Sequence, residues 1–228
     1  KDPDIVICTF GDLIRVPGSF SSLEKQKAEN SNIRIVYSVM EALDFAISNK
    51  KKKIIFLAIG FETTSPSTAV AIVKASGLKL KNFFVLSAHK LMPPAMSAII
   101  DFGVNINGYL CPGHVSTITG SSIYNFIPEK YNLGCVVSGF EPVDILQSIY
   151  MLLLQFNENK PKVEIQYKRA VTVEGNKKAL NFMQNVFEPA DDNWRGIGVI
   201  EKSGLKIRPE YSAFDAEVQF SLPDIITI

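Results

Sequence analysis

Two glutamates and two histidines are the side chains of this 228-residue chain best suited to chemistry, because each lies in a loop after a short apolar run. Glu62 and Glu141 could exchange protons as a general acid/base pair. His89 and His114 could ligate a metal or transfer a proton near neutral pH. We therefore predict acid/base chemistry or metal binding in these loops, with His114 as the candidate metal ligand and Asp144 as a further catalytic candidate.

Each of these residues also has a structural interpretation. A carboxylate such as Glu62 can accept hydrogen bonds from backbone N–H groups at the start of the next helix. A histidine can hold a loop in place, and Thr63 and Thr64 serve equally well as helix caps or as ligand contacts. These residue types alone leave both interpretations open.

Three glycines, Gly60, Gly113 and Gly139, lie in the same loops and would let a ligand approach the backbone closely. Asp12 and Arg15, in the loop after the first apolar run, are further candidates for cofactor binding, although an ion pair between the two would make that loop an ordinary one. The chain has neither GxGxxG after its first predicted strand nor GxxxxGK[ST] anywhere, so a nucleotide site lacks its usual motif.

The elements that must position these residues follow the pattern of a parallel α/β fold, in which apolar runs, turns and helices alternate. We predict Rossmann-like, doubly wound domains. Strands are expected at residues 4–9, 34–37, 54–59, 83–87, 108–110 and 135–138, and helices at 39–48, 67–76, 94–102, 115–126 and 142–157. The two Gly-Phe-Glu turns would then lie at the carboxyl ends of strands, where open α/β sheets bind ligands.

The pattern becomes less regular after Pro161. We expect a strand at 163–167, a helix at 177–186 and extended segments at 196–200 and 205–207. The predicted division is residues 1–50 in a first α/β domain, 51–160 in a second, and 161–228 returning to the first domain and starting a C-terminal region. Trp194 and Arg195 are residue types that often anchor interfaces, and a tryptophan in the core is an equal alternative.

Composition excludes several classes of protein. Hydrophobic residues make up 46% and the net charge is +1, which fits a folded globule and offers no broad basic surface for nucleic acid. No apolar run reaches the roughly 18 to 20 residues that span a bilayer, and the first residues do not resemble a signal peptide, so we expect a cytoplasmic protein. Cys8, Cys111 and Cys135 are far apart without a CxxC pair, which predicts buried, reduced thiols.

Taken together and in order, several motifs resemble the HypD family of hydrogenase maturation factors, over residues 4–217. The motifs are Thr9-Phe10-Gly11-Asp12 with Arg15-Val16-Pro17-Gly18-Ser19, Gly60-Phe61-Glu62-Thr63-Thr64, Pro112-Gly113-His114-Val115-Ser116, Gly139-Phe140-Glu141-Pro142 with Asp144, Glu174-Gly175-Asn176, and Trp194-Arg195-Gly196. The resemblance implies two α/β domains around a cleft lined by Glu62, Thr63, Thr64, His114 and Glu141.

The resemblance also implies a function. Such a protein is a scaffold on which an iron ion acquires cyanide and carbon monoxide, giving the Fe(CN)2CO centre of [NiFe] hydrogenase, together with a HypC-type chaperone and a HypE-type cyanide donor. The family also carries a [4Fe-4S] cluster in a small cysteine-rich region. An alternative is a doubly wound α/β enzyme in which Glu62, Glu141 and His114 act on a small metabolite.

This sequence departs from the family pattern at both ends. The family's upstream Cys-Gly-Gly-His-Thr-His motif and its downstream cluster cysteines are absent, and residues 218–228 do not resemble the family's continuation. Since a cluster normally needs four thiolates, we expect this truncated chain not to assemble one by itself.

Overall fold

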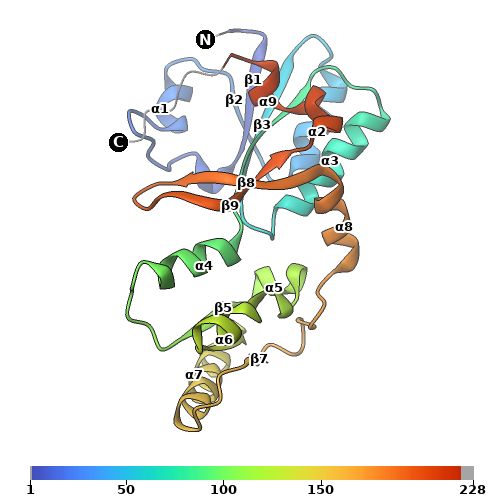
Figure 1. The fold of residues 1–228 in the computed structure, drawn as a ribbon. Coiled ribbons are helices and arrows are strands. Elements are labelled where there is room, and N and C mark those ends of the chain that lie inside the picture. Colours follow the sequence, from blue (N-terminus) through green and yellow to red (C-terminus); the bar gives the residue numbers. More distant parts are fainter. Residues whose placement is uncertain (1, 222–228) are drawn as a thin grey trace.

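The computed structural model describes residues 2–221 and arranges them as two parallel sheets and one antiparallel hairpin (Figure 1). Helices alternate with the strands of both parallel sheets, which confirms the predicted α/β class. In Figure 1 the blue-to-cyan and orange-to-red segments lie together in one body, and the green-to-yellow segment forms the other. The first body is therefore built from both ends of the described chain.

The first sheet has the strand order β2-β1-β3-β4, all parallel. Its strands are β1 (Ile5–Phe10), β2 (Ile33–Val36), β3 (Lys53–Gly60) and β4 (Phe83–His89), and its helices are α1 (Leu23–Ala28), α2 (Val39–Ser48) and α3 (Ser65–Gly77), with the short η1 (Gly11–Leu13) after β1. Alternate residues of β3, Ile54, Phe56 and Ala58, are fully buried and form the centre of the first core.

The second sheet has the order β5-β6-β7, also parallel. It contains β5 (Gly108–Pro112), β6 (Gly134–Ser138) and β7 (Val163–Ile165), packed with α5 (Gly113–Thr119), η2 (Ser122–Tyr124), α6 (Phe126–Tyr131) and α7 (Pro142–Asn157). All five residues of β6 are buried, as expected for a central strand. Cys111, Tyr124 and Cys135 belong to this second core.

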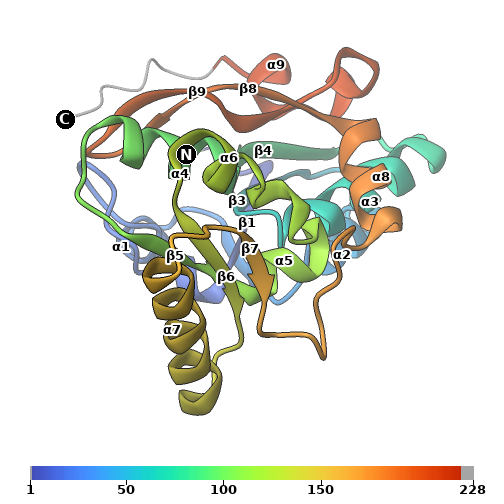
Figure 2. The same cartoon turned by 60° about the horizontal axis from the view of Figure 1, so that its bottom comes forward.

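Two connections join the bodies. The helix α4 (Met92–Asp101) leads from β4 toward the second sheet, and the segment before α8 (Lys177–Val186) leads back. The hairpin of β8 (Phe187–Trp194) and β9 (Gly198–Ile207) then packs Phe187, Leu205 and Ile207 into the first core. Figure 2 shows this hairpin beside β4, where Lys90 and Gly204 form a bridge. The described chain ends with η3 (Pro209–Phe214) and α9 (Ala216–Gln219).

The structure confirms the predicted helices α2, α7 and α8 at the expected bounds and corrects two other expectations. The predicted helix at 115–126 is wrong, because Gly120 adopts a positive φ of 78° that ends α5 and starts a new direction. The extended segments at 196–200 and 205–207 are one strand, β9. The strand β8 was not predicted, since its proline and acidic residues are unusual in strands.

The pairing of β1 with β3 joins residues on both sides of the predicted boundary at residue 50. The division into 1–50, 51–160 and 161–228 itself stays a prediction. No helix among residues 2–221 is long and apolar enough to cross a membrane. Residues 222–228, part of the stretch that was expected to depart from the family pattern, lie outside the described residues.

The three cysteines are free and buried, as predicted. Burial raises the pKa of Cys8 to about 11, so its reactive thiolate is rare at neutral pH. We expect fewer than one thiol per chain to react with dithiobis-nitrobenzoate within minutes in buffer, and all three in denaturant. Lys51 is exposed, so a Lys51→Cys variant supplies a matched reactive thiol. Native thiols that react as fast as this control would contradict the burial.

Candidate functional site

The turn after β3 packs tightly on itself. Gly60 has φ 138°, and a Cβ there would contact the Thr64 hydroxyl, which donates to the Phe61 carbonyl at 3.1 Å. Thr63 is exposed on the surface, and Thr64 is half-buried at the N-cap of α3. Glycine at position 60 thus allows the tight turn in which Glu62, two residues later, is buried.

Glu62 is only 2% exposed. Its Oε1 accepts a hydrogen bond from the Met92 backbone N–H at 2.9 Å, so it holds the start of α4 against the end of β3. Its Oε2 is buried without a hydrogen-bond partner. Burial raises the pKa of the carboxyl group, because the charged form loses its hydration.

Glu62 borders a chamber of about 380 Å³ that is bounded by segments of both bodies. Thr119 and Ile123 come from the second body, and most other lining residues come from α4, α8 and the β8–β9 hairpin. The full lining is Glu62, Leu91, Pro93, Pro94, Thr119, Ile123, Leu180, Met183, Gln184, Phe187, Pro189, Lys202 and Leu205. The chamber is thus predominantly apolar and has one buried carboxyl group in its wall.

His89, at the end of β4, is fully engaged inside the first body. Its Nδ1 lies 3.4 Å from the Gly60 carbonyl and its Nε2 lies 3.1 Å from the Thr68 hydroxyl, and its ring contacts Phe187 edge-on. Burial lowers its pKa to about 4, so the ring is neutral at pH 7. Both nitrogens are occupied, which favours the structural interpretation of His89.

The carboxyl edge of the second sheet gathers residues that follow all three of its strands. His114, after β5, is exposed and stacks on Phe140, after β6, with ring centroids 4.0 Å apart. Tyr167, after β7, meets Phe140 edge-on. An added Cβ at Gly113 would contact Tyr167 and the Ser138 carbonyl, and one at Gly139 would contact Tyr167 and the Asp144 carboxylate, so close packing explains both glycines.

Asp144 is buried beneath this edge. Its carboxylate accepts two hydrogen bonds from Arg169, at 3.0 and 2.5 Å, and one from Gln166 at 2.9 Å. The bonds from Arg169 and then Gln166 hold the pKa of Asp144 down at about 2. Glu141 is exposed, with its Oε1 3.9 Å from Arg169. Asp144 therefore orders the loop after β7 as a permanent anion.

At the first sheet, the tip of the β8–β9 hairpin reaches the loops after β1 and β3. Arg195 donates to the Pro17 carbonyl at 3.1 Å, and Trp194 lies 6.1 Å from Phe61 between ring centroids. Three of the sequence motifs thus meet here. Asp12 and Arg15 are exposed, and Arg15 pairs with Glu24 at 3.3 Å rather than with Asp12.

The predicted residues consequently fall into two groups. Glu62, Thr63 and Thr64 follow strand β3 of the first sheet, whereas His114, Glu141 and Asp144 follow strands of the second. Among residues 2–221 no hydrogen bond or ion pair joins Glu62 to Glu141, so their acid/base pairing stays a prediction. Sequence reasoning missed Gln166 and Arg169, although the end of a third parallel strand would have pointed to the same edge.

Within the described part of the chain, no group of three or more histidine, cysteine or acidic side chains is arranged to hold a metal. His114 is a single exposed imidazole. The cysteines do not fit a [4Fe-4S] cluster, because Cys8 lies in the first core and the other two in the second.

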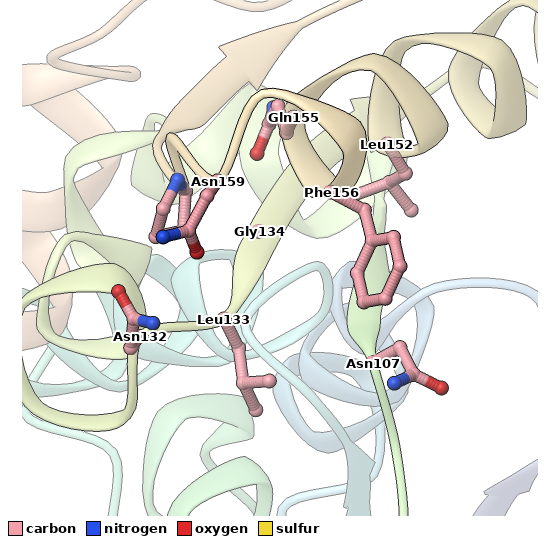
Figure 3. Close-up of a pocket in the computed structure, with 9 residues that line it drawn as sticks. Asn107, Asn132, Leu133, Gly134, Leu152, Gln155, Phe156 and Asn159 are labelled. Carbon is pink, nitrogen blue, oxygen red and sulfur yellow. The ribbon is translucent and has the colours of Figure 1, made fainter.

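Another hollow, of about 340 Å³, lies at the amino-terminal ends of β5 and β6, on the edge opposite His114 (Figure 3). Asn107, Asn132 and Asn159 point their amides around it, and Phe156 of α7 lies alongside. None of its lining residues is titratable, so it lacks an acid, a base or a thiolate.

Comparison with known proteins finds a matching family and several similar relatives. Residues 1–227 match the model of a family described as HypD, hydrogenase formation hypA family. The expectation that residues 218–228 depart from the family is therefore wrong for residues 218–227. The chain is 44% identical to hydrogenase maturation factor HypD2 of Bradyrhizobium diazoefficiens, over 98% of the chain and 61% of the relative. It is 43% identical to a putative hydrogenase expression/formation protein of Methanocaldococcus jannaschii, over 98% of the chain and 63% of the relative.

Hydrogenase maturation factor HypD of Escherichia coli K12 is 42% identical, over 96% of the chain and 59% of the relative. The chain thus spans about three-fifths of the length of the curated relatives that it matches.

Proposed function

Because this chain belongs to the HypD family, we propose that it forms part of a scaffold for assembling the Fe(CN)2CO centre of [NiFe] hydrogenase. The observation that carries the proposal is the family match over residues 1–227. The relatives' names refer to hydrogenase maturation or formation, which supports the same role here. The iron centre is the cargo of this scaffold, and the expected location is the cytoplasm.

The geometry is compatible with a scaffold of two bodies. Glu62 ties the turn after β3 to α4, the helix that leads to the second sheet, and so supports the relative position of the two carboxyl edges. His114, with its exposed ring, is the candidate iron contact on the second edge. The acid/base enzyme alternative is less well supported, because Glu141 is exposed and paired with Arg169 while Glu62 is buried.

The proposed partners are a HypC-type chaperone and a HypE-type cyanide donor. We expect native mass spectrometry under anaerobic conditions to detect a one-to-one complex between this chain and the HypC-type chaperone of its organism. The matched control is a version extended at both ends to the length of the relatives. A complex with both versions would locate the docking surface within these residues.

A complex with the extended version alone would assign the docking surface to the flanking segments and would reject it for this chain. Absence of both complexes would reject the partnership itself. An unrelated protein of similar size and charge controls for nonspecific association in the spectrometer.

A further inference from the structure

The helix α7 is amphipathic in the opposite sense to most helices of globular proteins, whose apolar side faces the core. Its buried residues are polar, namely Asp144, Ser148 and Gln155. Ser148 donates to the Ser138 hydroxyl of β6 at 2.9 Å, and Gln155 donates to Glu164 of β7 at 2.8 Å. Polar contacts thus hold α7 on its sheet, while most of its large apolar side chains stay exposed.

The opposite side of α7 is an exposed apolar surface, which we call the outer face. It consists of Val143, Leu146, Ile149, Tyr150, Leu153 and Leu154, each between 40% and 73% exposed. These residues recur at intervals of three and four, so they form one stripe along the 16-residue helix. In Figure 1, α7 lies at the end of the second body farthest from the first. Their exposure shows that no segment among residues 2–221 covers this stripe.

This apolar surface continues onto the second sheet through a groove of about 390 Å³. Leu110 of the edge strand β5 lines the groove together with Ile149, Leu153 and Phe156 of α7. With roughly 150 to 250 Å² for a large apolar side chain, the outer face, Leu110 and Phe156 together expose on the order of 800 Å². The largest apolar patch of a typical monomer is about 300 to 600 Å², and larger patches mark interaction sites.

Size and charge indicate a second copy of the chain as the molecule that covers the outer face. An interface of standard size buries about 800 Å² on each partner, which is the apolar area available here. Asp144 is the only charged residue between Pro142 and Asn157, and it is buried on the side of the sheet. The outer face therefore offers no charge by which an oppositely charged partner could be recognised. Two outer faces can meet without bringing like charges together.

We propose that two copies of this chain associate through their outer faces, with the two α7 helices antiparallel about a two-fold axis. A two-fold interface uses the same patch on both copies, as a self-complementary apolar stripe allows. Antiparallel helices also place the start of one α7 beside the end of the other, so the exposed Glu141 of one copy lies near the exposed Lys160 of the second. Opposite charges then meet at the rim of the interface. The proposal does not depend on the role in hydrogenase formation.

Sedimentation velocity on the intact chain tests the proposal. Interfaces that bury about 1,600 Å² in total give Kd values from micromolar to picomolar, so we expect a dimer with a Kd of about 10 μM or tighter. Protein concentrations from about 0.1 to 100 μM bracket the upper end of this range. A monomer at all of these concentrations would overturn the proposal. Open-ended association beyond the dimer would also overturn it, because a two-fold interface closes on itself.

A charge in the outer face separates this interface from other contacts. Leu153→Glu buries an unpaired carboxylate in the apolar contact of the dimer, so the Kd should rise about hundredfold or more. Leu78→Glu is the matched control, because Leu78 is 51% exposed against 54% for Leu153 but lies at the end of α3 in the first body. That variant should associate like the parent chain, and circular dichroism melting verifies that both variants fold. Unchanged association of Leu153→Glu would overturn the proposal.

Cross-linking is a second test that does not require Leu153→Glu to fold. A thiol at position 150, in the middle of α7, lies close to its counterpart across the proposed axis, so Tyr150→Cys should form a disulfide-linked dimer with oxidised glutathione. Lys51→Cys, exposed on the first body, should cross-link several-fold less. The native cysteines are buried and contribute little to either reaction. Equal cross-linking of the two variants would contradict a two-fold axis at α7.

Discussion

Replacing Gly120 with alanine is expected to lower the free energy of unfolding by about 3 kcal/mol or more, through backbone strain and overpacking together. Gly120 has φ 78° at the end of α5, a conformation that side-chain-bearing residues adopt only with strain. An added Cβ would also contact the Val173 carbonyl and lie 2.6 Å from Gly175 N. Urea unfolding monitored by circular dichroism measures the change.

The expected size reflects what Gly120 holds together. Gly175, with φ 66°, packs directly against the Gly120 backbone, and the Asn176 N–H donates to the Ile118 carbonyl at 2.8 Å. This contact joins the end of α5 in the second body to the start of α8, which packs on the first. It therefore helps to set the distance across the chamber, between Thr119 and Leu180.

Gly103→Ala is the matched control. Gly103 follows the end of α4 with φ 77°, nearly the value at Gly120, but nothing lies within 4 Å of an added Cβ. The alanine there carries the backbone strain alone, about 1 kcal/mol. If Gly120→Ala and Gly103→Ala lower the free energy of unfolding by the same amount, the close contact between Gly120 and Gly175 does not contribute to stability.

The second large effect is a loss of stability in acid that depends on His89. Its pKa is about 4 in the folded chain, where burial disfavours the charged ring, and about 6.5 when unfolded. Between these values the unfolded chain binds more protons, so stability falls as the pH decreases from about 6.5 toward 4. The full difference between the folded and unfolded pKa values corresponds to about 3 kcal/mol in the free energy of unfolding.

Glu62 acts in the opposite direction, because its raised pKa makes the folded chain bind protons more readily than the unfolded chain does. The comparison of the parent chain with His89→Gln cancels this contribution. The groups that face the His89 ring are the Gly60 carbonyl, the Thr68 hydroxyl and Phe187, none of which titrates in this range.

Urea unfolding at intervals from pH 7.5 to 4.5 measures the free energy of unfolding of the parent chain and of His89→Gln. The stability advantage of the parent chain over His89→Gln should be largest at pH 7.5 and shrink by about 2 to 3 kcal/mol at pH 4.5. Two parallel curves would mean that His89 titrates normally in the folded chain, and that its burial does not disfavour the proton.

The sequence by itself predicted the α/β class, because apolar runs and helix starts are local patterns that neighbouring residues produce. The bounds of α2, α7 and α8 could be read in this way. The break of the helix predicted at 115–126 could not, since a glycine inside a helical pattern is only weak evidence for a turn. Gly120 takes its positive φ because residues 173–175 pack against it from far along the chain.

The two Gly-Phe-Glu turns illustrate the same division at the candidate site. Their identical residues follow parallel strands, as predicted from the sequence, so both glutamates lie at carboxyl edges. Only the tertiary structure gave them different environments. Glu62 is covered by α4 and the chamber wall, which remove it from water and raise its pKa, whereas Glu141 starts α7 at the surface beside Arg169. Burial depends on elements distant in sequence, and a local pattern carries no information about which of them will cover a given turn.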